Sequence, residues 1–219
     1  MVGSVTIPDG HSSSDMTRGG WEPRLASLLG AAADGVTRSH LQALVAQTVR
    51  EDADIEFKAR LYGTSDKQKR DLAADVAALA NERGGVIVLG VAEEDGVASG
   101  LCPVEVSENE ELRMRQIVAS SCAPHVAFEI HRVRDDPDAA GNGFFLLVVP
   151  PSAARPHSVQ KGVDLRFPRR DGALTRYMTE SEVAQLYRDR LPGRTMVLVS
   201  RTCRPSATNS RRCQARRPP

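Results

Sequence analysis

One stretch, residues 51–96, restricts the possible folds more than any other part of this 219-residue chain. An Ala-rich segment ends at Ala80-Asn81, the pair Gly84-Gly85 follows, and residues 86–89 form an apolar run without alternation. Glycine adopts the left-handed backbone that ends many helices, and a continuous apolar run is typical of a strand covered on both faces. The stretch therefore predicts a helix, a tight turn and a central strand of a sheet.

Acidic residues flank this predicted turn and strand on both sides. Glu51 and Glu56 precede the Ala-rich segment, and Glu93-Glu94-Asp95 follows the strand. Apolar and charged residues alternate around Glu56, so a strand there would place Glu56 and Lys58 on the same outward face. If the segments near positions 55 and 90 lie side by side, their acids gather at one edge of the sheet, where a phosphate backbone or a divalent cation can bind.

Capping patterns and apolar spacing predict the other elements. Three pairs resemble capping boxes with apolar residues at helical spacing behind them: Ser65 with Gln68, Ser107 with Glu110, and Thr179 with Glu182. Ser39 is placed to cap a further helix that runs through Val49. Additional strands are predicted for residues 126–133, 144–149 and 163–167.

Composition separates the two ends of the chain from its middle. Residues 1–36 are rich in Gly, Ser and Asp without a sustained period, which predicts a disordered N-terminal segment. Residues 193–219 contain many arginines and no acidic residue, and we interpret them as a disordered basic tail. This tail is either an electrostatic arm for nucleic acid or a basic end without function. Residues 37–192 then form one folded domain.

The overall charge and hydropathy exclude several classes of protein. The net charge is +1, which argues against a protein that coats nucleic acid by its total positive field and leaves room for local basic patches. No apolar run approaches the roughly 20 residues of a membrane helix. The N-terminus lacks the basic start and apolar core of a signal peptide, so a cytoplasmic protein is expected.

Residues that often bind metals or nucleotides are not at the spacings that those sites require. The four cysteines are too far apart for paired metal ligands, and we interpret them as free thiols: Cys102, Cys122, Cys203 and Cys213. His157 has no second His or Cys at ligand spacing, which favours a packing or surface role. Asn81 is expected to hold the glycine turn. The chain has no Gly-x-x-x-x-Gly-Lys-Ser/Thr loop, so ATP hydrolysis is not expected.

Several short motifs follow one another in a fixed order. They are Glu51, Glu56-Phe57-Lys58, Ala78-Leu79-Ala80-Asn81, Gly84-Gly85, Gly90-Val91 with Glu93-Glu94-Asp95-Gly96, and finally Arg155-Pro156-His157 with Phe167-Pro168-Arg169-Arg170-Asp171-Gly172. In this order they resemble the Schlafen-type AlbA family, a divergent Alba group associated with DNA binding, over residues 41–190. The resemblance implies an α+β fold whose mixed sheet carries helices mainly on one side. It also implies association with DNA or RNA.

In the Schlafen branch, the resemblance implies a metal-dependent endoribonuclease site for structured RNA such as tRNA. Glu51 and Glu56 match two of its catalytic acids, and Glu93 and Glu94 are the candidates for the third. The implied cofactor is Mg²⁺ or Mn²⁺, with Glu51, Glu56 and Glu93 as ligands, since hard cations prefer carboxylate oxygens. The zinc-binding Cys and His cluster of the animal Schlafens has no counterpart here.

Basic residues near the last motif predict contacts with nucleic acid. The candidates are Lys58, Arg155, Arg166, Arg169, Arg170 and Arg176. Guanidinium groups along a phosphate track add affinity and salt dependence without base preference. The alternative is that these arginines pair with neighbouring acids. Only Phe167 and Tyr177 interleave with them, which gives little support for the stacking of single strands.

Taken together, these patterns predict a nucleic-acid-binding domain with a role in regulation or defence. A metal-dependent endoribonuclease is the first alternative, and a protein-binding sensor or scaffold is the second. A homodimer is a further expectation, because one small sheet offers little surface to a duplex.

Overall fold

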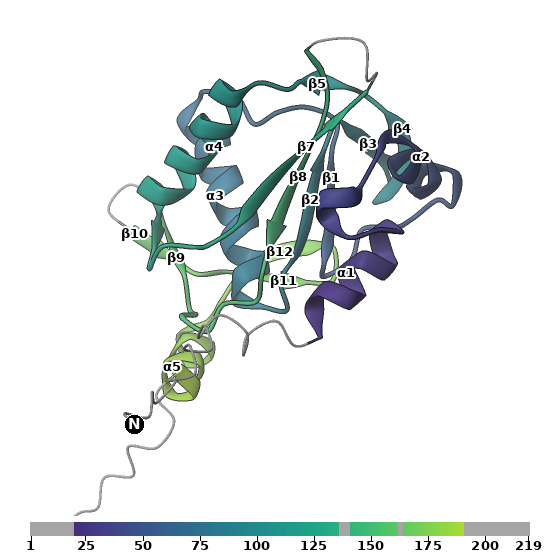
Figure 1. Cartoon of the computed structure of the whole chain (residues 1–219). Helices are drawn as coiled ribbons and strands as arrows, with labels where there is room; N and C mark the ends of the chain where they lie inside the picture. The colour runs from purple at the N-terminus through teal and green to yellow at the C-terminus, as the bar shows by residue number, and fades with distance from the viewer. Residues whose placement is uncertain (1–19, 136–140, 162–163, 191–219) are drawn as a thin grey trace, which may run out of the picture.

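A computed structural model describes residues 20–135, 141–161 and 164–190. The predicted basic tail and the first 19 residues lie outside these ranges. The main sheet is mixed and central (Figure 1), with strands β1 (Ile55–Lys58), β2 (Gly85–Leu89), β5 (Val104–Glu105), β7 (Glu129–Arg134) and β8 (Asn142–Val149). β1 pairs in parallel with β2, whereas β8 pairs antiparallel with β2, β5 and β7. Within the described ranges, every helix is too short or too polar to cross a lipid bilayer.

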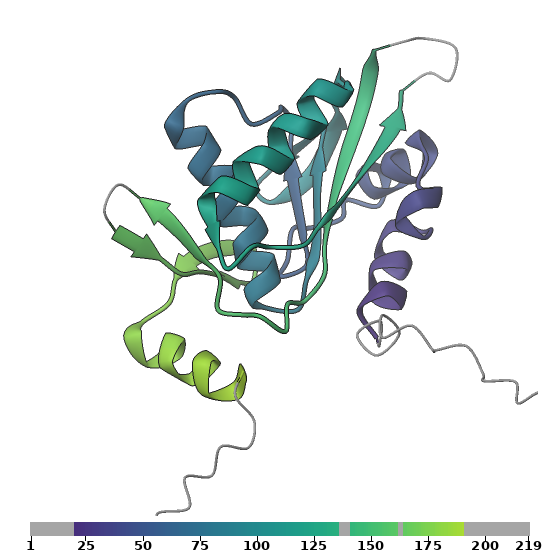
Figure 2. The same cartoon turned by 60° about the vertical axis from the view of Figure 1, so that its left-hand side comes forward.

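Helices cover both faces of the main sheet. The longest two, α3 (Asp66–Asn81) and α4 (Glu108–Ser121), pack on one face, where they enclose Ile87, Phe145 and Leu147 (Figure 2). The shorter helices α1 (Trp21–Leu29) and α2 (Arg38–Ala46) pack on the other face over Phe57 and Leu146. The α+β fold is confirmed, with the larger helices together on one side of a mixed sheet.

The N-terminal prediction needs a correction. Residues 21–35 are folded as α1 and the 3-10 helix η1 (Ala33–Gly35), although the sequence analysis assigns them to a disordered segment that ends at residue 36. Leu25 and Leu29 lie one helical turn apart and are 5% and 1% exposed. Burying a leucine stabilises a fold by about 1.5–3 kcal/mol, so this one apolar turn outweighs the Gly- and Ser-rich composition around it.

The predicted helix ends and the central strand agree with the structure. Ser65 and Ser107 accept hydrogen bonds from the N–H groups of Gln68 and Glu110, each at 3.3 Å. Gly84 ends α3 with a φ of 73°, in the left-handed region. β2 lies between β1 and β8 and is buried along its whole length. One cap differs, because Thr37 and not Ser39 precedes α2.

Three small sheets surround the main one. β3 (Val91–Glu94) pairs with β4 (Val97–Leu101), β9 (Ser158–Lys161) pairs with β6 (Cys122–Ala123) and β10 (Asp164–Arg166), and β11 (Pro168–Asp171) pairs with β12 (Leu174–Tyr177). β9 and β11 pack against α3, and α5 (Glu180–Arg190) follows β12. The strand predicted for residues 163–167 thus corresponds to β10. Pro168 has no N–H for a continued ladder, and the chain begins a new hairpin there.

Candidate nucleic-acid interface

The structure places the acidic segments side by side, as predicted. β1 pairs with β2, and the Glu51 N–H donates to the Gly96 carbonyl at 2.7 Å, which brings the segment before β1 beside the turn after β3. Burial raises the pKa of Glu51, and the negative charges of Glu56 and Glu93 raise it further against an opposing hydrogen bond from Phe57. That bond joins the Phe57 N–H to Glu51 Oε1 at 2.7 Å. The Glu51 carboxylate therefore accepts a hydrogen bond from a backbone N–H of β1. The Glu93 carboxylate similarly accepts from the Gly96 N–H at 2.8 Å.

Glu56 does not face solvent. Its side chain is 8% exposed and forms ion pairs with Lys58, two residues away on β1, and with Arg170 of β11. The Arg170 side chain is 2% exposed, and its Nη2 also donates to the Asp52 carbonyl at 2.8 Å. The buried pair attaches the β11–β12 hairpin to the edge of the main sheet. Arg170 is therefore not available to a phosphate.

The glutamates do not fit the metal that the resemblance implies. Among the described residues, no group of three His, Cys, Asp or Glu side chains is arranged to hold a metal ion. The two Glu56 oxygens contact Lys58 and Arg170, respectively. A Mg²⁺ site requires open carboxylate oxygens with room for water and phosphate ligands. A catalytic step through Mg²⁺ or Mn²⁺ thus has no geometric support from Glu51, Glu56 and Glu93. Glu94 is exposed on β3.

Like Arg170, the other predicted arginines have close partners within the protein. Arg176 Nη2 contacts Glu182 Oε1 at 2.6 Å, and Arg169 Nη1 contacts the same oxygen at 3.2 Å. The hydrogen bonds from Arg176 hold the pKa of Glu182 well below its usual range. Arg155 Nη1 donates to the Glu82 carbonyl at 3.3 Å. The predicted alternative, pairing with neighbouring acids, therefore describes Arg169 and Arg176, which join the hairpin to α5, and also Arg166, which pairs with Asp164.

Other cations line a hollow between α3 and the small hairpins, which we call the basic groove. Its two adjoining sections share Lys67, Asp71 and Tyr177, and the larger section has a volume of about 640 Å³. The cationic lining comes from the end of β1, the loop after it, the first half of α3 and β10: Lys58, Arg60, Lys67, Arg70 and Arg166. Two carboxylates, Asp71 and Asp75, also line it. Of the six predicted cations, Lys58 and Arg166 therefore belong to the groove.

Several charges of the basic groove are open to a ligand. No contact within the described residues joins Arg60 or Arg70 to a carboxylate. Lys67 is 83% exposed and lies 3.7 Å from Asp71, and Arg166 is 48% exposed and lies 3.5 Å from Asp164. Exposed pairs of this kind contribute only about 0–1 kcal/mol and are easily exchanged for a phosphate contact. Arg60, Lys67 and Arg70 were not among the predicted cations, although Lys67 and Arg70 are three residues apart and share a helix face.

Asp75 introduces a titratable charge into the wall of the basic groove. The Tyr62 hydroxyl donates to Asp75 Oδ2 at 2.7 Å. Burial and the nearby charge of Glu56 raise the pKa of Asp75 to about 6. The groove therefore becomes more positive as the pH falls through 6.

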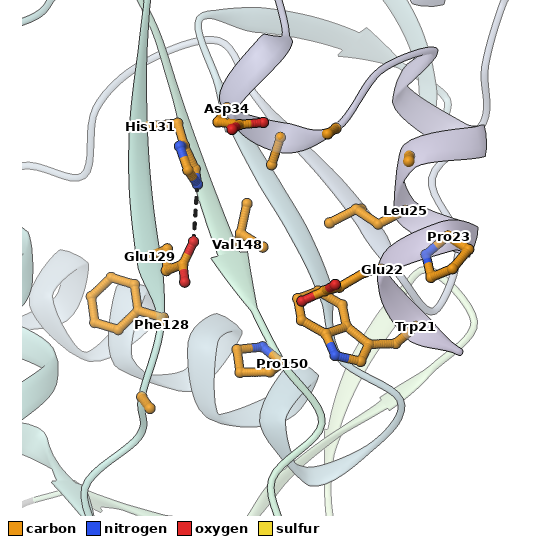
Figure 3. Close-up of a pocket in the computed structure, with 14 residues that line it drawn as sticks. Trp21, Glu22, Pro23, Leu25, Asp34, Phe128, Glu129, His131, Val148 and Pro150 are labelled. Atoms are coloured by element: carbon orange, nitrogen blue, oxygen red, sulfur yellow. Dashed lines mark hydrogen bonds and ion pairs between the residues drawn. The ribbon is translucent and has the colours of Figure 1, made fainter. Parts of the chain in front are cut away.

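A second hollow, the Trp21 groove, has the opposite charge. It has a volume of about 630 Å³ and lies between α1 and β7, with Trp21 and Leu25 on one side and Glu129 and His131 on the other (Figure 3). Its charged lining is acidic, because the residues that line it include Glu22, Asp34 and Glu129 but neither Lys nor Arg. His131 Nε2 lies 3.2 Å from Glu129 Oε2. A polyanion is repelled by such a surface, which leaves the basic groove as the better candidate for an anionic ligand.

Asn81 connects α3 with two of the small sheets. Its Nδ2 donates to the carbonyls of His157 and Pro168 at 2.9 and 2.8 Å, and its Oδ1 accepts from the His157 N–H at 2.7 Å. Asn81 thus holds β9 and β11, and not only the glycine turn expected for it. Its partners are 76 and 87 residues away, beyond the reach of any local sequence pattern. His157 is fully buried, which confirms its packing role, and burial lowers its pKa.

Comparisons with known proteins identify relatives of this domain. The family model described as Schlafen, AlbA_2 matches residues 51–179. The DIP2311 protein from Corynebacterium diphtheriae is 20% identical with a TM-score of 0.44, over 77% of this chain and 28% of that one. The N-terminal domain of an ATP-dependent DNA helicase RecG-related protein from Nitrosomonas europaea is 20% identical with a TM-score of 0.43, over 59% of this chain and 84% of that one. No curated protein matches the chain.

Proposed function

Because the chain belongs to the Schlafen AlbA_2 family, we propose that it binds nucleic acid, and that the basic groove is the binding site. The observation that supports this site most directly is its lining, in which five cationic side chains outnumber two carboxylates. Each Lys or Arg that contacts a phosphate releases counterions, and this release supplies most of the affinity of sequence-independent binding.

The arrangement of these cations suits an extended polyanion. Lys67 and Arg70 lie on α3, whereas Arg166 lies on β10 across the same section of the groove. Lys58 and Arg60 continue the positive lining along the larger section. A strand in the groove therefore meets cations from both walls and along its length, and nonspecific phosphate contacts position it without reading its sequence.

A salt series tests this proposal. Wild-type affinity for labelled DNA and RNA is measured by fluorescence anisotropy at increasing salt, and log K is expected to fall linearly with log[salt]. Arg70→Ala removes one phosphate contact, so the slope should become shallower by about 0.7–0.9. The matched control is Arg134→Ala, since Arg134 is exposed on β7 outside the basic groove. A slope unchanged by Arg70→Ala, or lowered equally by Arg134→Ala, would place binding elsewhere.

The same samples separate the alternative functions. The endoribonuclease alternative requires that the wild type cuts structured RNA with Mg²⁺ or Mn²⁺ and that Glu56→Ala loses cutting but keeps binding. The sensor or scaffold alternative requires that no polynucleotide binds in a salt-dependent way. The contacts of Glu56 with Arg170 and Lys58 favour binding over cleavage. Sedimentation of the same protein tests the expected homodimer.

A further inference from the structure

We propose that the basic groove takes single-stranded nucleic acid, with the face of an unpaired base stacked on Tyr177. This inference rests on the proposed function and adds the class of strand that the groove binds. Tyr177 borders both sections of the groove and is 48% exposed. Lys67, Arg70 and Arg166 line the same section as its ring. The aromatic surface thus lies among the cations expected to contact phosphates.

The backbone of Tyr177 is held in place on both sides. In the β11–β12 hairpin Tyr177 is opposite Pro168, and it shares a hairpin face with Thr175 and the buried Arg170. The preceding residue, Arg176, is paired with Glu182 across the other face. The following residue, Met178, donates its N–H to the Phe167 carbonyl at 2.8 Å. Tyr177 therefore presents a half-exposed ring from a fixed position, which reduces the conformational entropy lost on binding.

The chemistry of a single strand fits this position better than that of a duplex. In a duplex the base faces are stacked on one another, and a protein reaches only the phosphates, sugars and base edges. An unpaired base exposes its face, and aromatic side chains among cations are the usual means of binding it. The Arg166 guanidinium lies over the Tyr177 ring, 5.9 Å from its centre, so the ring already stacks with one planar cation, and an unpaired base would replace that cation or stack on the opposite face.

Binding of matched oligonucleotides to ring variants tests the inference. The probes are oligothymidylate and oligouridylate of about 12 nucleotides, within the usual range of single-strand sites, and a DNA duplex of the same length. We expect the wild type to prefer the single strands. Tyr177→Ala should weaken single-strand binding by about 5- to 150-fold, the range that stacking of one base produces, and should leave duplex binding nearly unchanged.

Two further variants distinguish stacking from other effects of the ring. Tyr177→Trp keeps an aromatic face and should retain single-strand binding. Tyr187→Ala is the matched control, because Tyr187 is 43% exposed on α5 and lies outside the groove. A 2-aminopurine base in the probe should be quenched by the wild type and by Tyr187→Ala, and much less by Tyr177→Ala. Circular dichroism melting of each variant shows whether the fold is retained.

The outcomes separate this inference from the function on which it rests. Equal loss of single-strand and duplex binding in Tyr177→Ala, or no loss in either, overturns the stacking role. Failure of Tyr177→Trp to bind single strands, with its fold retained, does so as well. Salt-dependent binding by the wild type in those cases leaves the proposed function standing. Absence of binding to every probe overturns both.

Discussion

The larger section of the basic groove and the Trp21 groove have nearly equal volumes, about 640 and 630 Å³, but different surroundings. The Trp21 groove is built on aliphatic residues of the core, Leu25 and Val148. The basic groove lies beside buried charges, the Glu56–Arg170 pair and Asp75. Hollows of similar size on this domain therefore differ in the sign of their lining charges.

The acids near the basic groove help to keep its cations charged. Burial acts to lower the pKa of Lys58, but the hydrogen bond and charge of Glu56, together with the charges of Asp75 and Glu51, outweigh burial, so the pKa of Lys58 is raised. Lys58 remains 37% exposed and lines the groove. The buried carboxylate of Glu56 thus stabilises the positive charge of Lys58 at the surface of the groove. The described lining of the Trp21 groove has no such arrangement. Four predictions test this contrast.

The largest effect is expected from Arg170→Ala, which leaves Glu56 buried with one of its two cations removed. Breaking a buried ion pair by deleting one partner costs about 3–5 kcal/mol in the free energy of unfolding. Urea unfolding measures it, with Arg134→Ala as an exposed control. A loss below about 1 kcal/mol would show that the pair is not the foundation of the hairpin. The double change Glu56→Gln with Arg170→Met should recover part of the loss.

The second effect concerns binding. Lys67→Glu combined with Arg70→Glu replaces two cations of the basic groove with anions, and nucleic-acid affinity at low salt should fall by about 10- to 100-fold. The free energy of unfolding should change by no more than about 0.5 kcal/mol, since these are surface positions. Anisotropy and urea unfolding of the same preparation give both values. Unchanged affinity with an intact fold would contradict the assignment of the groove.

The third effect depends on pH. Because the pKa of Asp75 is about 6 in the folded chain and 3.8 ordinarily, the folded state binds more protons than the unfolded state between these values. Stability therefore falls as the pH rises through this interval and stays lower above it. Asp75→Asn removes the buried charge and should stabilise the fold by about 1–2 kcal/mol at pH 8, after allowance for solvent screening, but not near pH 4. Destabilisation at pH 8 would mean that the Tyr62 hydrogen bond outweighs burial.

The smallest effect is expected in the Trp21 groove. Glu129→Gln removes one exposed charge there. The equilibrium constant for unfolding and the affinity for nucleic acid should each stay within about twofold of the wild-type value. A larger gain in affinity on removal of this carboxylate would show that a polyanion also reaches the Trp21 groove. The comparison between the two grooves would then fail.

Local sequence patterns predicted the structural features that depend on residues close together in the chain. The caps at Ser65 and Ser107, the glycine turn and the buried β2 strand follow from rules that span a few residues, and all agree with the structure. The adjacency of the acidic segments also agrees with the prediction, because β1 pairs with β2 and the β3–β4 turn folds back beside residue 51. The exception is α1, where two leucines at helical spacing were outweighed by composition.

Long-range pairing decided the rest. Arg170 and Glu56 are 114 residues apart, and nothing local distinguishes the buried Arg170 from Arg166, which is half-exposed in the basic groove. The motif that carries the family resemblance therefore contains a residue that holds the fold together. Conversely, Arg60 and Arg70 lie outside the quoted motifs, and only the packing of α3 against the hairpins reveals them as groove residues.

The hydrogen bonds of Asn81 have a mechanical consequence. One amide joins the end of α3 to the starts of both β9 and β11, so helix and hairpins meet at a shared anchor point. Loops at the free ends of the hairpins can lengthen, shorten or change sequence without shifting that anchor. Arg166 and Tyr177 lie opposite Val159 and Pro168, near the anchored ends of their hairpins, so such changes leave the spacing between the groove walls unaltered.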